Sequence, residues 1–217
     1  MKRSLLAFVF LMGLSLSTHA QMQKGSWIAD GQVGGYATNE KSEHQDPSWD
    51  DYNLSSKATS FYFGPGVGYF IQDNLALGIS GRFQVVTASA QNGENEALRG
   101  NQLTYGMGLF SRKYFPAGER LSFYGELHAS GLWGTFGNIE EESSDRTVST
   151  KIQGFKASAG LGVQYLVKDF LGLHLQTTLV DYDRFKNTGV TYDYSGTSSN
   201  LNARLFSSFQ IGASFFF

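Results

Sequence analysis

A histidine and a serine, His128 and Ser130, stand two positions apart, and an acidic run follows at Glu140, Glu141 and Glu142. A serine hydroxyl becomes a nucleophile when a histidine base takes its proton. This residue set therefore suggests ester or amide hydrolysis. The alternative is that His128 is an interior polar residue and that the glutamates are solvated loop acids. We favour this alternative, because acid–base catalysis requires a geometry that spacing alone does not provide.

The candidate metal ligands form no recognisable motif. The histidines beyond the N-terminal segment are scattered: His44, His128 and His174. None has the paired spacing of a zinc site. Acidic groups within 46–51 and 140–145 offer oxygen ligands for calcium or for divalent ions that bridge lipid phosphates. Ordinary solvated acids explain them equally well, so no metal or cofactor is expected.

The elements that position these residues are strands. Apolar and polar residues alternate with a period of two, which is typical of half-buried strands, and no helical stripe competes. About eight such segments follow the N-terminus, with ends uncertain by about 2–4 residues. They lie near 25–40, 57–71, 75–90, 101–115, 121–136, 151–167, 170–185 and 200–217.

The last segment shows the alternation most clearly. Its apolar face carries Leu201, Ala203, Leu205, Phe209, Ile211, Ala213, Phe215 and Phe217, and its other face carries Asn202, Arg204, Ser208, Gln210, Gly212 and Ser214. Successive side chains of a strand point to opposite faces, so one face of this strand can meet lipid and the other a hydrated lumen. Phe217 is expected to pair with the strand near Trp27. This pattern predicts a transmembrane β-barrel.

The connections alternate in length, which supports a barrel built from hairpins. Short connections at 72–74, 116–119 and 168–169 alternate with longer polar stretches at 41–56, 91–100, 137–150 and 186–199. Short turns on one side and long loops on the other are typical of outer-membrane barrels, whose turns face the periplasm. We therefore predict an all-β, eight-stranded antiparallel transmembrane barrel with short periplasmic turns and long extracellular loops.

The polar faces of the segments predict a filled lumen. The inward set contains a network of charged and histidine residues, namely Asp30, Arg82, Arg112, Glu126, His128, Lys156, His174 and Arg204, together with several glutamines. An eight-stranded barrel is just wide enough for its side chains to fill it. Because an unpaired buried charge is costly, we expect the two acids to pair with Arg82, Arg112, Lys156 or Arg204. Strand register, which decides the partners, does not follow from the sequence.

The outward faces should contact lipid. They include Ile79 on the third segment, Met107 and Leu109 on the fourth, and Leu171, Leu173, Leu175 and Leu179 on the seventh. Aromatic residues on them fall into two groups, as expected for the two girdles of a membrane barrel. Tyr69, Phe115, Phe123, Tyr165, Phe215 and Phe217 lie near the turns, and Phe61, Trp133 and Phe155 lie nearer the loops. Glycines such as those at 64–68 are expected to make room for large inward side chains of neighbouring strands.

Residues 1–20 have the features of a secretory signal peptide: a basic start, an apolar run and small residues before Ala20. The expected mature domain is therefore 21–217. Loss of Lys2 and Arg3 takes the formal net charge from −2 to −4, which gives no basic footprint for nucleic acid. The chain has no cysteine, so disulfides contribute nothing to its stability.

The chain resembles the small outer-membrane β-barrel proteins of Gram-negative bacteria, which are porin-like and include OmpX-type, OmpW-type and OmpA-type barrels. The last residues resemble the assembly signal of such barrels, with Gln210, Gly212, Phe215 and Phe217 at the matching positions. This resemblance implies the outer membrane as location, with lipid, lipopolysaccharide and the barrel assembly machinery as partners. It implies no particular activity.

A narrower resemblance concerns the outer-membrane lipid A deacylases, whose active site includes a His-x-Ser pair and a carboxylate. Here it covers only 128–130 and a loop acid. It departs from that family in two respects, because His128 and Ser130 are expected to face inward and because the pair lies in mid-chain. We therefore expect no enzymatic activity.

The expected function is a structural or surface-interaction role in the outer membrane, with a lumen filled by polar side chains. Any extracellular ligand of the loops is unknown. The first alternative is a narrow channel or carrier for small solutes, and the second is a lipid-modifying enzyme. A soluble lipocalin-like barrel, with its apolar face inside, is the alternative for the fold.

Overall fold

The computed structural model describes residues 22–44, 52–92, 98–139, 148–189, 195–203 and 209–217. The predicted signal peptide at 1–20 lies outside these residues. Strands make up almost all of the described chain: β1 (Trp27–His44), β2 (Tyr52–Gln72), β3 (Leu75–Asn92), β4 (Leu98–Pro116), β5 (Leu121–Ile139), β6 (Val148–Lys168), β7 (Leu171–Gly189), β8 (Ser195–Ala203) and β9 (Phe209–Phe216). No helix in the described ranges is long and apolar enough to cross a membrane.

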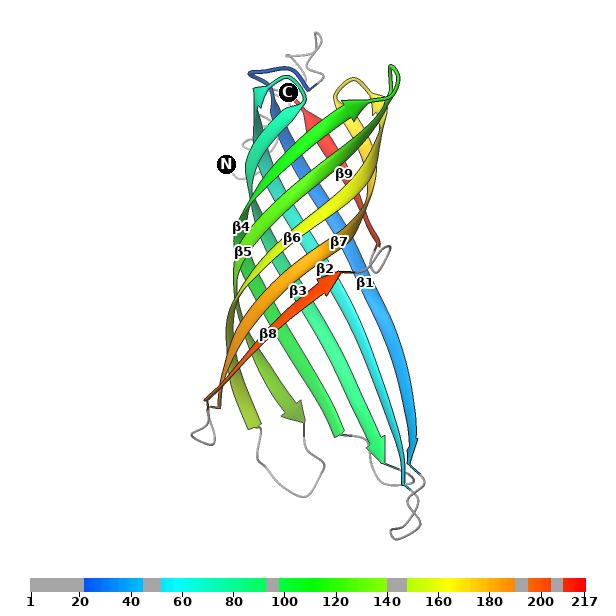
Figure 1. The fold of residues 1–217 in the computed structure, drawn as a ribbon, viewed down its shortest axis with the longest axis vertical. Helices are drawn as coiled ribbons and strands as arrows, with labels where there is room; N and C mark the ends of the chain where they lie inside the picture. Colours follow the sequence, from blue (N-terminus) through cyan, green and yellow to red (C-terminus); the bar gives the residue numbers. More distant parts are fainter. Residues whose placement is uncertain (1–21, 45–51, 93–97, 140–147, 190–194, 204–208) are drawn as a thin grey trace, which may run out of the picture.

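The strands form one antiparallel sheet that closes into a ring (Figure 1). Each strand from β1 to β7 pairs with the next along the chain, and β9 pairs with both β7 and β1. Because β8 pairs with the other part of β7, β8 and β9 share one position, and the ring has eight strands. The predicted eight-stranded antiparallel barrel is confirmed. The segment predicted as one strand over 200–217 is described as two, with 204–208 outside the described residues.

The two ends of the barrel differ in their connections. We call the end with the connections at 73–74, 117–120 and 169–170 the turn end, and the opposite end the loop end. Asn74 has a φ of 63° in the first of these turns, a conformation that asparagine adopts more readily than most residues. Several strands reach further towards the loop end than predicted. β2 begins at Tyr52 rather than at residue 57. Beyond the lipid the backbone pairing of a hairpin continues without an apolar face, so the alternation in the sequence ends before the strand does.

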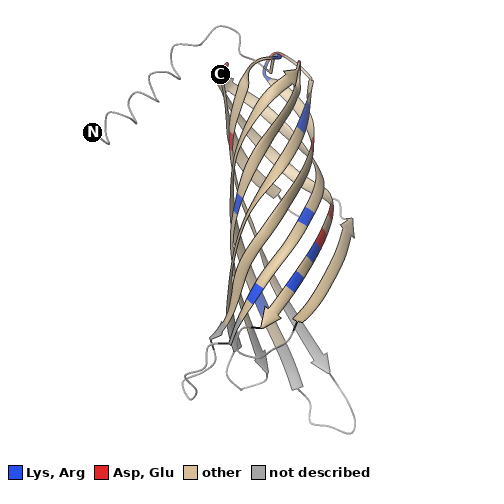
Figure 2. Ribbon diagram, turned by 90° about the vertical axis from the view of Figure 1, so that its left-hand side faces the viewer, with Lys and Arg blue, Asp and Glu red and all other residues tan. Residues whose placement is uncertain are grey.

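The wall has an apolar outer face and a polar inner face. Met107, Leu109 and Ile79 expose 68%, 65% and 58% of their surface, as the predicted lipid-facing set requires. Both predicted aromatic groups lie on this exposed face: Tyr69, Phe115, Phe123, Tyr165, Phe215, Phe217, Phe61, Trp133 and Phe155. Basic and acidic residues are scattered over the strands, with both signs close together on one of them (Figure 2). The inverted faces of a lipocalin-like barrel do not match this wall.

The residues predicted to form the lipid-facing side of β7 are wrong beyond the middle of this strand. The pairing of β6 with β7 shifts between Ala159 and Gly160, where Leu179 is an extra residue opposite β6. Such a bulge exchanges the two faces of the strand that follows. Leu179 was predicted to continue the apolar face of the strand, but Val180 and Tyr182 take over that face. The exchange turns the next acidic residues into the lumen.

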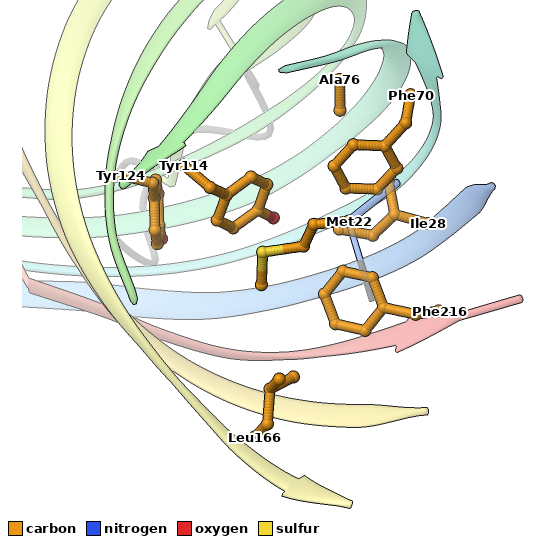
Figure 3. Close-up of a cluster of buried hydrophobic side chains, with 8 residues drawn as sticks. All are labelled: Met22, Ile28, Phe70, Ala76, Tyr114, Tyr124, Leu166 and Phe216. Atoms are coloured by element: carbon orange, nitrogen blue, oxygen red, sulfur yellow. The ribbon is translucent and has the colours of Figure 1, made fainter. Parts of the chain in front are cut away.

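The apolar core lies inside the turn end of the barrel. Its side chains come from most strands and from the segment before β1, and they converge on one another in Figure 3: Met22, Ile28, Phe70, Ala76, Tyr114, Tyr124, Leu166 and Phe216. The segment that carries Met22 folds across the turn end. The Met22 carbonyl accepts a hydrogen bond from the Asn74 amide at 2.7 Å, and the Gly25 amide donates to the Phe70 carbonyl at 2.9 Å. Side chains therefore fill this end of the lumen.

Candidate functional site in the barrel lumen

A cluster of three charged residues and a histidine lies next to this apolar core, on the side towards the loop end. We call Asp30, Arg112, Glu126 and His174 the Arg112 cluster. Arg112 donates to Asp30 through Nη1 at 3.0 Å and through Nη2 at 3.2 Å, and to Glu126 through Nε at 2.7 Å. The Arg112 side chain is 1% exposed and those of its partners are 3% and 5% exposed. One guanidinium from β4 thus joins carboxylates of β1 and β5 in the interior.

A second layer of polar groups completes the hydrogen bonding of the two acids. The Ser214 hydroxyl donates to Asp30 at 2.6 Å, and the Gln176 amide donates to Glu126 at 3.1 Å. His174 Nδ1 lies 3.2 Å from the Ser214 hydroxyl and 3.7 Å from Asp30. Because charged groups in a low-dielectric interior need partners, this layer stabilises both carboxylates.

Glycines let these large side chains fit, as the sequence predicted. A side chain at Gly78 would overlap the ring of Phe110, and one at Gly212 would overlap the ring of His174. Gly68 lies under the same Phe110 ring, where an added Cβ would come within 2.9 Å of it. The lumen is therefore filled by pairing large residues on one strand with glycines on a neighbour.

A cavity of about 640 Å³ lies between the Arg112 cluster and the loop end. Acids and bases of the cluster line its floor, and its wall combines polar side chains such as Gln84 and Gln102 with apolar ones such as Leu132 and Phe185. On one side it borders Tyr36 of β1 and Asn202 of β8, two strands between which the described residues show no pairing. The Tyr62 hydroxyl lies 2.8 Å from Gln32 and 3.0 Å from Gln210 in the wall. The lumen thus has a filled half and a hollow half.

Two predicted network residues line the cavity and lie outside the Arg112 cluster. Lys156 approaches Asp181 at 3.4 Å, with both side chains partly exposed. Arg82 has no carboxylate within 4 Å in the described part of the chain, and donates only to Gln84, at 3.3 Å. Arg204 lies outside the described residues. Of the bases predicted as partners of Asp30 and Glu126, Arg112 is the one that pairs with both acids.

His128 and Ser130 are not hydrogen-bonded to each other. Both residues point into the lumen, but His128 Nε2 lies 2.7 Å from the hydroxyl of Ser80, on another strand. The Ser130 hydroxyl is buried and has no hydrogen-bond partner among the described residues. The candidate acids at 140–142 and the acidic groups at 46–51 and 140–145 lie outside the described ranges. Within those ranges no group of side chains is arranged to hold a metal ion.

Sequence reasoning missed two inward acids, Asp181 and Asp183. Asp181 accepts from Lys156 and from Asn202, and Asp183 accepts from Asn200 at 3.1 Å. The missed signal is a change of phase in β7. Leu171, Leu173 and Leu175 occupy odd positions, whereas Val180 and Tyr182 occupy even positions before Phe185 ends this pattern. A bulge between these points was therefore detectable from the alternation itself.

The four residues of the predicted assembly signal lie on β9 and directly after it. Gln210 and Gly212 face the lumen, whereas Phe215 and Phe217 lie on the outer face with 49% and 41% of their surface exposed. The Phe217 amide donates to the Trp27 carbonyl at 3.0 Å, and the Trp27 amide donates back at 2.6 Å. This pairing with β1 is the closing seam of the ring.

Comparisons with known proteins agree with this architecture. A family model described as "Outer membrane protein beta-barrel domain" matches residues 6–217. No curated protein matches the chain. The outer membrane protein OprG from Pseudomonas aeruginosa is 13% identical, with a TM-score of 0.54 over 92% of this chain and 99% of that chain. The attachment invasion locus protein Ail of Yersinia pestis is 15% identical, with a TM-score of 0.40 over 90% of this chain and all of that chain.

At such identities the likeness to solved structures concerns the fold alone. The family model, in contrast, spans nearly the whole sequence, and the apolar outer wall fits the membrane that its description names. The chain therefore belongs to the outer-membrane β-barrel family, and its location is the outer membrane.

Proposed function

We propose that this protein has a structural or surface-interaction role in the outer membrane and that its lumen is closed to flow through the turn end. In barrels of this class the short turns face the periplasm and the loops face outward. The closed half then lies on the periplasmic side, and the cavity opens towards the cell exterior. Under this proposal the barrel presents a surface and a cavity without forming an open pore.

The observation that carries this proposal is the Arg112 cluster. Arg112 joins Asp30 and Glu126 in the lumen at 1% exposure, and the apolar core lies directly behind it. Breaking a buried ion pair costs about 3–5 kcal/mol, so an open path past the cluster is rarely populated. The proposed barrier is thus a bonded layer backed by an apolar one.

Planar lipid bilayer recording tests the proposal. The refolded protein should give no conductance steps, whereas an open porin inserted under the same conditions gives them. Arg112→Ser combined with Tyr114→Ala removes the bonded layer and part of the apolar layer, and should produce measurable steps. Regular conductance steps from the unmodified protein would contradict the proposal.

A small-solute carrier is the second candidate, and the cavity of about 640 Å³ favours it. This volume lies in the usual range of small-molecule sites, about 300–1,000 Å³. A carrier has to move its solute past the Arg112 cluster, so transport should be slow and saturable. Swelling of protein-containing liposomes in small polar solutes, at rates above those of empty liposomes, would favour the carrier.

We also propose three partners for the outer face and the last strand. Lipid and lipopolysaccharide contact the exposed apolar wall, and the barrel assembly machinery recognises the Gln210, Gly212, Phe215 and Phe217 set. The exposed rings of Phe215 and Phe217 support recognition by the assembly machinery, since they present apolar surface beside the closing seam. No catalytic role and no nucleic-acid partner are proposed.

A further inference from the structure

Arg82 and Arg112 both face the lumen, and they differ in how their guanidinium groups are satisfied. Arg112 donates to Asp30, Glu126 and the Tyr114 hydroxyl. Among the described residues, Arg82 makes one hydrogen bond, from Nη2 to Gln84 at 3.3 Å, and its buried Nε has no partner there. A guanidinium has five N–H donors, so most of the capacity of Arg82 is unused.

The surroundings of Arg82 make an unpaired guanidinium costly. Its central carbon lies 4.8 Å from the centre of the Tyr62 ring, which partly shields it from water. Gln84 is itself engaged, because its amide donates to the Ser60 hydroxyl at 2.8 Å. A charged group that is partly removed from water normally has a counter-charge. No carboxylate of the described residues lies within 4 Å of Arg82, because Asp181, which lines the same cavity and attracts Arg82 from further away, contacts Lys156 instead.

The cavity has room for the missing counter-charge. Arg82 lines its wall together with the neutral polar side chains Gln84, Gln102 and Thr104. The opposite wall carries Lys156, whose 3.4 Å contact with Asp181 is long and partly exposed. A second cation is thus available to an anion of moderate size. The two cations, and the amides and hydroxyls around them, favour a hydrophilic anion over an acyl chain.

We propose that the loop-side cavity is a binding site for a small water-soluble oxyanion, with Arg82 as its main ligand. A guanidinium binds carboxylates and phosphates through two parallel N–H donors, and these charge-assisted bonds are stronger than neutral ones. The ligand class is therefore a small organic carboxylate or phosphate that enters from the loop end. The Arg82–Tyr62 stack holds the donor group in place before the anion arrives.

Isothermal titration calorimetry tests this site, with inorganic phosphate and succinate as probes and the full chain refolded in zwitterionic detergent. The unmodified protein should bind at least one probe saturably at millimolar concentrations. Arg82→Gln should weaken binding by about 10- to 100-fold, the effect of losing charge-assisted hydrogen bonds. Arg120→Gln, the same charge change on an exposed turn-end residue, is the matched control and should bind as the unmodified protein does.

Two further measurements separate the site from a folding effect. Arg82→Lys keeps the charge but loses the paired donors, so its affinity should fall between those of the unmodified protein and Arg82→Gln. Without probe, Arg82→Gln should unfold at an equal or higher urea concentration than the unmodified protein, because it removes an unpaired charge. A probe that binds should raise the unfolding midpoint of the unmodified protein but not that of Arg82→Gln.

Three results would overturn the inference: no binding of either probe at up to about 50 mM, equal binding by Arg82→Gln, or a marked loss of stability in the probe-free Arg82→Gln variant. The inference rests on the proposed function in one respect, since the closed turn end provides the floor of the cavity. The two fail differently. An open turn end appears as conductance of the unmodified protein, and a missing oxyanion site appears as absent binding in a non-conducting barrel.

Discussion

Replacing Arg112 by methionine should destabilise the barrel more than any other single charge removal considered for the lumen. The change keeps much of the side-chain volume but leaves Asp30 and Glu126 without the guanidinium that both contact at 3.0 Å or less. Breaking a buried pair costs about 3–5 kcal/mol. Because one cation here serves two acids, each at most 5% exposed in its side chain, we expect a loss at the upper end of that range.

The expected loss of stability comes from leaving Asp30 and Glu126 charged without a partner, rather than from lost packing. A variant in which the whole cluster is neutral separates these two causes. In Arg112→Met combined with Asp30→Asn and Glu126→Gln, no charge of the Arg112 cluster remains. Neutral replacement of a whole buried ionic cluster is often close to neutral for stability. This triple variant should therefore regain most of the stability that the single variant loses.

Equilibrium unfolding in urea, followed by tryptophan fluorescence in detergent micelles, measures these differences. Lys156→Met is the control, because its contact with Asp181 is 3.4 Å long with side chains 23% and 18% exposed. A partly exposed pair is worth about 0–1 kcal/mol. The reasoning is refuted if Arg112→Met loses less than about 1 kcal/mol, or if the triple variant is as unstable as the single one.

Three other changes probe the wall, the lumen packing and assembly. Leu109→Arg should cost about 2–4 kcal/mol in lipid-reconstituted unfolding, because the exposed leucine lies between the two aromatic groups, and no loss would argue against its contact with lipid. Gly78→Ala should cost about 1–3 kcal/mol through overlap with Phe110, and combining it with Phe110→Leu should recover part of that loss. Phe217→Ala should lower the amount of folded protein in outer membranes while leaving refolding in detergent unchanged; equal membrane levels would exclude a signal role.

The alternation of side chains made the fold predictable from the sequence. Lipid on one face and a polar lumen on the other impose a period of two along every spanning strand. Ile79, Met107 and Leu109 follow it, and all three are highly exposed on the wall. The strand ends at the loop side were less predictable. Beyond the lipid the backbone ladder continues without an apolar face, so the pattern that marks a strand disappears before the strand does.

The partners within the lumen were not predictable, because they depend on register. Arg112 and Glu126 are directly opposite each other in the pairing of β4 with β5, whereas Asp30 reaches the same guanidinium from across the lumen. Neither relation follows from spacing in the sequence. The position of Asp181 required the bulge at Leu179 to be recognised. A single extra residue changes the face of every later side chain on its strand, so one missed bulge removes two acids from the predicted network.

The division of the lumen suggests why Arg82 and Arg112 serve different purposes. The large side chains with less than 2% exposure all lie towards the turn end, where short connections and the Met22 segment hold the strands together. Buried ion pairs and close contacts of side chains with glycines can fill that end, because no ligand has to enter it. Towards the loop end the same inner wall carries a cavity, a long Lys156–Asp181 contact and an incompletely bonded Arg82. If stability resides in the turn end, charge can be left unpaired at the loop end, and substitutions at Arg82 should change binding without changing how the barrel closes.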